Sequence, residues 1–142
     1  MSKNLILFFF GLSLFSICSC SKPDCTTALP PPDYFLLQIQ DTTGNNLIGT
    51  TYTDSSYKLT GDNYEAFVSP EPTGPQYMLR IHPMELKNGE DYYLKLSDAD
   101  SDTLSVVYSV KEDECFTSFI LTSVVYNGED FGADRPVIVE KK

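Results

Sequence analysis

The chain has 142 residues, with 10 basic and 20 acidic side chains and a formal net charge of −10. Binding to nucleic acid needs clustered lysine and arginine that displace counterions, so this charge balance disfavours it, and it equally disfavours electrostatic docking on anionic lipid. The length allows one domain with a substantial hydrophobic core, but not two.

The first segment, residues 1–19, has the composition of a secretory signal. Lys3 is the only charged residue before Lys22, and the thirteen-residue run Leu5–Ile17 between them is almost entirely apolar. As a helix, this run would reach roughly 20 Å, which is short of the ~30 Å hydrocarbon core of a bilayer. We therefore expect an export signal that is removed, rather than an N-terminal transmembrane helix.

The end of this segment resembles the lipobox of bacterial lipoproteins. Ile17-Cys18-Ser19-Cys20 has an aliphatic residue, two small residues and then the cysteine. The resemblance implies cleavage before Cys20, diacylglycerol on its sulfur and acylation of the amine that cleavage frees. Two or more acyl chains anchor a protein stably where one does not. Cys18 is the competing acceptor, but the residue before it is isoleucine rather than a small residue.

The cysteine count favours the same cut. Cleavage before Cys20 removes Cys18, uses Cys20 for lipid and leaves Cys25 and Cys115 as an even pair. Disulfides persist outside the cytoplasm, and closing a loop of this length contributes roughly 4 kcal/mol in the chain-entropy model. The alternative is a metal held by two free thiols, which lacks further ligands because His82 is the only histidine. We expect a Cys25–Cys115 disulfide.

Residues 20–33 are expected to form a lipidated tether and a stiff spacer. The residues after Cys20 are polar, and Pro30-Pro31-Pro32 predicts polyproline II structure at ~3.1 Å per residue. Such a spacer would lift the following domain off the bilayer. The signal contains one lysine and no acid, so the remaining chain carries a charge of −11. This charge keeps an exported domain soluble.

Residues 34–142 show apolar residues with a period of two, which indicates strands. Seven segments are expected to be strands: Tyr34–Gln40, Ser56–Thr60, Tyr64–Val68, Tyr77–Ile81, Tyr92–Leu96, Asp102–Val110 and Cys115–Tyr126. The alternation is clearest in the sixth segment, where Leu104, Val106, Tyr108 and Val110 should point inward. Turn residues such as Asn88-Gly89 separate the segments. The pattern predicts a single Ig-like antiparallel β-sandwich of about seven strands, with a small closed β-barrel as the alternative.

A wider resemblance covers most of this domain. Phe35–Ile48 reads as a strand followed by Asp-x-x-Gly-Asn-x-Leu, and it resembles the opening of small lipoproteins common in Bacteroidetes. Tyr92–Leu96, Asp102-Thr103-Leu104, Cys115 and Val125–Gly128 are similar to the second half of those proteins. The matching motifs are turns, strands and a cysteine, so the resemblance implies location and fold and no particular activity.

The most suggestive polar cluster is Asp98, Asp100 and Asp102. Alternating carboxylates begin calcium loops, because hard cations bind several oxygens at once. An EF-hand is excluded, since Thr103 stands where the glycine belongs and Ser109 where the bidentate glutamate belongs. A looser calcium site is the alternative to a solvated hairpin loop. We expect the loop, and no metal or cofactor besides the lipid on Cys20.

Other candidates for chemistry are weaker. Glu112-Asp113-Glu114 is expected to be a strand connection, and His82 a residue at a strand end, because no nucleophile motif accompanies it. Tyr52, Tyr57 and Tyr64 form either an aromatic platform for sugars or peptides, or the wet edge of the core. We therefore do not expect an enzyme.

The function that these features favour is a membrane-anchored, non-enzymatic binding or accessory module of the cell envelope. A small secreted hydrolase and an envelope ligand carrier are the alternatives. The expected partners are the bilayer, through the acyl anchor, and an envelope protein or glycan, but not nucleic acid. Ser21, rather than an aspartate, after the lipidated cysteine favours the outer membrane, facing the periplasm or the cell surface.

Overall fold

The structure is a computed structural model that describes residues 25–142, except 54–56, 63 and 74–75. The expected signal and Cys20 lie outside the described residues. Within the described ranges, the chain is all-β apart from one turn of 3-10 helix, η1 (Pro83–Glu85). No helix in this part of the chain is long and apolar enough to cross a bilayer.

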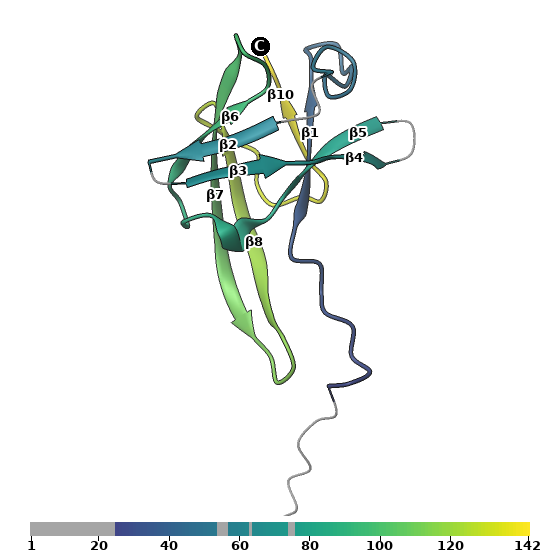
Figure 1. The fold of residues 1–142 in the computed structure, drawn as a ribbon, viewed down its shortest axis with the longest axis vertical. Coiled ribbons are helices and arrows are strands. Elements are labelled where there is room, and N and C mark those ends of the chain that lie inside the picture. The colour runs from purple at the N-terminus through teal and green to yellow at the C-terminus, as the bar shows by residue number, and fades with distance from the viewer. Residues whose placement is uncertain (1–24, 54–56, 63, 74–75) are drawn as a thin grey trace, which may run out of the picture.

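The strands form two sheets, as Figure 1 shows. The four-stranded sheet consists, in spatial order, of β10 (Val137–Glu140), β1 (Phe35–Gln40), β5 (Gln76–Ile81) and β4 (Pro70–Thr73). The six-stranded sheet consists of β3 (Tyr64–Val68), β2 (Tyr57–Gly61), β6 (Asp91–Lys95), β7 (Ser101–Glu112), β8 (Thr117–Tyr126) and β9 (Glu129–Asp130). The two sheets are separate and open at their edges, so the predicted β-sandwich is confirmed and the barrel alternative is not.

Seven strands overlap the predicted segments, but β4, β9 and β10 were not predicted. Pro70 and Pro72 of β4 are turn-forming residues, and they are tolerated because β4 is an edge strand that pairs only with β5. The other two strands are too short for an alternating pattern to be recognised. The expectation of a wholly antiparallel fold is also wrong in one place, because β10 runs parallel to β1. Parallel strands need a long connection between them, and here strands β2 to β9 all lie between β1 and β10 in the sequence.

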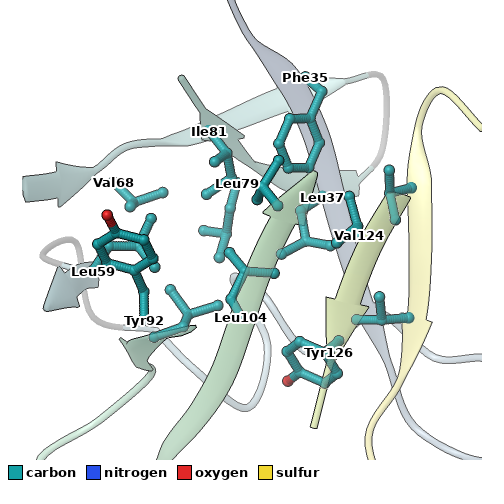
Figure 2. Close-up of a cluster of buried hydrophobic side chains, with 14 of the residues drawn as sticks. Phe35, Leu37, Leu59, Val68, Leu79, Ile81, Tyr92, Leu104, Val124 and Tyr126 are labelled. Carbon is teal, nitrogen blue, oxygen red and sulfur yellow. The ribbon is translucent and has the colours of Figure 1, made fainter. Parts of the chain in front are cut away.

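The inward residues of both sheets form one hydrophobic core (Figure 2). Leu37 and Leu79 of the four-stranded sheet are fully buried, as are Leu104 and Val124 of the six-stranded sheet. Burying side chains of this size contributes about 1.5–3 kcal/mol each. The core therefore depends on the period-two pattern that the sequence shows.

A bulge in β8 explains why this strand has apolar residues of both parities. Its buried apolar residues are Phe119, Leu121, Val124 and Tyr126. Val107 of β7 pairs with Ser123, whereas Tyr108 pairs with Leu121, so Thr122 is an extra residue. An extra residue reverses which side chains point inward beyond it. Odd-numbered residues of β8 therefore point into the core before the bulge, and even-numbered residues point into it after the bulge.

The β7–β8 hairpin extends beyond the other strands, at the end of the molecule where the chain enters β1 (Figure 1). Leu104 and Val106 are buried as predicted, but Val110 is 52% exposed. The expectation that Val110 belongs to the core is wrong, because the hairpin continues past the strands that cover the rest of β7. Sequence alternation shows which face a residue occupies, but not where the covering sheet ends.

Candidate functional site

A disulfide closes the domain at the tip of this hairpin. Cys25 and Cys115 are bonded, with their Cα atoms 5.4 Å apart and 90 positions between them in the sequence. Cys115 lies in the connection between β7 and β8, which Asp113 and Glu114 also form, whereas Glu112 is the last residue of β7. The predicted pairing is present. It also places the proline-rich segment inside a covalently closed loop, because both ends of that segment are held by the same domain.

The three aspartates considered for calcium do not converge. Asp98 is exposed and pairs with Lys95 at 2.6 Å, whereas Asp100 and Asp102 pair with Lys141. Within the described part of the chain, no group of three or more histidine, cysteine, aspartate or glutamate residues is placed to hold a metal ion. Asp98 therefore belongs to the loop between β6 and β7, and Asp100 and Asp102 belong to an ion-pair cluster.

This cluster joins the two sheets, and we call Tyr52, Asp100, Asp102, Tyr126 and Lys141 the inter-sheet cluster. Lys141 follows β10, and its Nζ atom forms ion pairs with Asp100 at 3.1 Å and with Asp102 of β7. Tyr52 donates a hydrogen bond to Asp100, and Tyr126 of β8 donates one to Asp102. The side chains of Lys141 and Asp102 are both mostly buried. A buried charge is costly unless an opposite charge lies beside it, and each of the two residues supplies that opposite charge for the other.

The electrostatics of the inter-sheet cluster favour a structural role. The hydrogen bond from Tyr52 and the charge of Lys141 hold the pKa of Asp100 below its ordinary value, although burial opposes this. Burial, together with the hydrogen bond to Asp102, raises the pKa of Tyr126 well above the usual range for tyrosine. The carboxylate of Asp100 thus stays ionised and the phenol stays protonated. Neither group is prepared to exchange a proton near neutral pH.

His82 and the three tyrosines are dispersed rather than assembled into a site. His82 follows β5 and lies 3.5 Å from Asp33, between Nδ1 and a carboxylate oxygen, as a residue at a strand end. Tyr57 is buried, Tyr52 belongs to the inter-sheet cluster, and Tyr64 donates a hydrogen bond to Glu85 at 3.2 Å. The three side chains do not share one exposed surface, so of the two alternatives their surroundings favour the edge of the core over an aromatic platform.

Two surface clefts differ in chemistry. The acidic cleft has a volume of about 250 Å³ and is lined by Asp62, Tyr64, Glu85, Lys87, Glu90 and Tyr92. The neutral cleft is larger, about 400 Å³, and its polar and aromatic lining is Asn45, Asn46, Thr50, Gln76 and Tyr77. Two glycines, Gly44 and Gly49, and Ile48 complete the described lining, and none of these described residues is charged.

The neutral cleft lies between the loop that follows β1 and the start of β5. Asn46 joins these two walls, because its Nδ2 atom donates to the carbonyl oxygens of Ile48 and Tyr77, both at 2.9 Å. The sequence patterns did not single out this cleft. Asn45 and Asn46 lie in the Asp-x-x-Gly-Asn-x-Leu motif and Tyr77 begins a predicted strand, and neither pattern indicates binding.

Comparisons with known proteins do not add a relative. No protein-family model matches the chain, and no curated protein or solved structure matches it. The neutral cleft and the disulfide-closed hairpin are the two features of the described residues that carry the functional argument below.

Proposed function

We propose that this chain is an exported lipoprotein, acylated at Cys20, whose β-sandwich is a non-enzymatic binding or accessory module of the cell envelope. The observation that carries the proposal is the Cys25–Cys115 disulfide. Structural disulfides persist in oxidising compartments, which the export signal would reach. The bridge also uses both cysteines that remain after cleavage before Cys20.

The disulfide also favours one orientation at the membrane. Cys20 and Cys25 are five positions apart, so a fully extended chain between them spans at most about 17 Å. Since Cys25 is bonded to the tip of the β7–β8 hairpin, an acyl anchor on Cys20 would hold that tip close to the bilayer. The loop after β1 lies at the opposite end of the long axis (Figure 1). The neutral cleft, which this loop lines, would therefore face away from the membrane.

The directions in which the carboxyl pKa values shift favour a non-enzymatic module over a small hydrolase. A general acid requires a carboxyl group whose pKa is raised towards neutrality. Among the described residues, the carboxyl groups with a resolved shift all have a lowered pKa: Asp41, Glu71, Asp98, Asp100 and Asp130. Hydrogen bonds cause these shifts, so the groups act as fixed acceptors.

The clefts support a surface binder over a ligand carrier. A carrier needs an enclosed apolar cavity of at least ~300 Å³. The acidic cleft is smaller, and the described lining of the neutral cleft includes the polar side chains of Asn45, Asn46, Thr50 and Gln76. Both suit ligands that are held at the surface.

Acyl labelling in a bacterial host that exports lipoproteins tests the anchor. The wild-type chain should incorporate labelled palmitate and remain with the membranes after a wash in high salt. Cys20→Ala should lose both the label and membrane retention, whereas Cys18→Ala should keep both. Persistent labelling of Cys20→Ala, or loss of the label in Cys18→Ala, would show that the anchor is elsewhere.

A further inference from the structure

We infer that the neutral cleft is a binding site for an uncharged saccharide, which would be the ligand of the anchored module proposed above and rests on that function. The sequence contains 20 acidic residues among 142, yet none of the residues that the structure describes in the lining of this cleft is charged. A saccharide without charge presents hydroxyl groups that both donate and accept hydrogen bonds. The Nδ2 groups of Asn45 and Asn46 bond within the protein, but amide groups such as that of Gln76 both donate and accept without carrying charge, so the lining matches this ligand class.

The aromatic side chain of Tyr77 supplies the apolar surface of the site. Tyr77 has the same parity on β5 as the buried residues Leu79 and Ile81, but it lies beyond the core and is 45% exposed. The ring face of an aromatic side chain carries partial negative charge, to which the C–H groups of a sugar ring are attracted. Exposed tyrosine also gives a large contact area at low conformational entropy.

A close approach between Gly49 and Tyr77 fixes this ring. Gly49 has a φ angle of +79°, and a Cβ atom at this position would lie 2.6 Å from Cδ2 of Tyr77. Only glycine combines this backbone conformation with such a close contact. The ring is therefore supported by the loop on one side, while nearly half of the side chain stays accessible.

Asn46 fixes the shape of the cleft, because its side chain bonds to both walls. Its Nδ2 atom is fully engaged by two carbonyl oxygens, which fixes the orientation of the amide. Its Oδ1 atom is the buried side-chain atom for which the described residues provide no hydrogen-bond partner. Because this atom is buried, it is not offered to a ligand, and Asn46 contributes to the site by holding the loop and β5 together.

The loop that carries Asn45 and Asn46 is held by its own hydrogen bonds. The carboxylate of Asp41 accepts from the backbone N–H groups of Thr43 and Asn45, at 2.8 and 2.9 Å. The Asn45 side chain donates to the same carboxylate at 3.1 Å. A loop ordered before the ligand arrives loses less entropy on binding. The volume of about 400 Å³ lies within the ~300–1,000 Å³ typical of small-molecule sites.

Other ligand classes fit the neutral cleft less well. A cation would require carboxylates and an anion would require lysine or arginine, and neither kind of side chain lines the cleft. The acidic cleft differs in this respect, because three carboxylates and one lysine line it. A charged saccharide would lose water at the neutral cleft without gaining an ion pair from the described lining, so we expect charge on the saccharide to reduce binding.

The test uses the full, lipidated chain in phosphatidylcholine vesicles, because detergents with sugar headgroups would compete for the site. Fluorescent neutral oligosaccharides of gluco, manno, galacto and xylo configuration are tested one by one, beside an oligosaccharide of uronic acids. At least one neutral oligosaccharide should bind, and the uronic acid oligosaccharide should not. Tyr77→Ala should weaken binding at least tenfold, whereas Tyr77→Phe should stay within about threefold. Tyr93→Ala is the matched control, because Tyr93 is 61% exposed on the other sheet.

The outcomes separate this inference from the proposed function. If no neutral oligosaccharide binds, or if Tyr93→Ala weakens binding as much as Tyr77→Ala, the saccharide site is overturned. Retention in the vesicles, measured on the same samples, reports on the anchor alone, so its loss would overturn the lipoprotein and not the site. Intact saccharide should be recovered after incubation. Recovery of cleaved products would overturn the non-enzymatic role.

Discussion

Lys141 forms an ion pair with Asp102 and so joins the last strand of the four-stranded sheet to β7 of the six-stranded sheet. The two residues are 39 positions apart in sequence. Asp100 is a second partner of the same lysine. A single cation, one residue from the end of the chain, therefore neutralises charge at the boundary between the two sheets.

Replacing this lysine should destabilise the domain. Lys141→Met leaves Asp102 buried without its cation, and breaking a buried pair in this way costs about 3 kcal/mol. Lys142→Met is the matched control, because Lys142 is 74% exposed and pairs with Glu129 at the surface, so its loss should change stability by less than ~0.5 kcal/mol. Urea unfolding followed by circular dichroism measures both. Equal stability of the two variants would mean that the inter-sheet cluster does not hold the sheets together.

The stability of the domain should fall in acid. The pKa of Asp100 is lower in the folded chain than in the unfolded one, chiefly because Tyr52 donates to it and Lys141 lies beside it. Its contribution is therefore present above the unfolded pKa of about 4 and is lost as the pH falls through the lower folded value. Asp100→Asn should be less stable than the wild type at pH 6, and this difference should shrink at pH 2.5.

Asp134→Asn is the control for this experiment, because Asp134 is exposed in the loop before β10. Its stability should follow that of the wild type at both pH values. The explanation for Asp100 would be wrong if the difference between Asp100→Asn and the wild type stayed constant with pH.

Removing the disulfide should lower stability without changing the fold. Closing a loop across 90 positions contributes about 4 kcal/mol in the chain-entropy model. The double variant Cys25→Ser, Cys115→Ser should therefore unfold at lower urea concentration and keep the circular dichroism spectrum of an all-β protein. Reductant should destabilise the wild type towards the variant, but leave the variant unchanged. A wild type insensitive to reductant would show that the bridge does not contribute.

A methyl group at Gly49 should disturb both the loop and the neutral cleft. Gly49→Ala places a Cβ atom against the Tyr77 ring and imposes a positive φ angle on alanine, whereas Gly44→Ala imposes only the positive φ angle, since nothing lies within 4 Å of its Cβ position. We expect a loss of about 1 kcal/mol for Gly44→Ala and at least twice that for Gly49→Ala. Thermal unfolding gives the ranking. Equal losses would mean that Tyr77 moves away without resistance.

The sequence predicted what local patterns encode. Period-two alternation and turn residues located seven strands, because a strand alternates its faces whatever lies above it. Cysteine parity predicted the Cys25–Cys115 bridge, since only two cysteines remain after the expected cleavage. The export signal and the acyl anchor on Cys20 are also sequence predictions, and they stay predictions.

The remaining features depend on which segments meet in space. Alternation alone does not reveal that Lys141 reaches Asp102, that a bulge reverses the inward face of β8, or that the sheet ends before Val110. Each requires the pairing and length of neighbouring strands, which no single segment contains. The neutral cleft also depends on tertiary contacts. Its two walls, the loop after β1 and the start of β5, meet only because Asn46 bonds to Tyr77, 31 positions away in the sequence. Sequence thus determined seven strands, most of their inward faces and the disulfide, and tertiary packing decided which polar residues stand together.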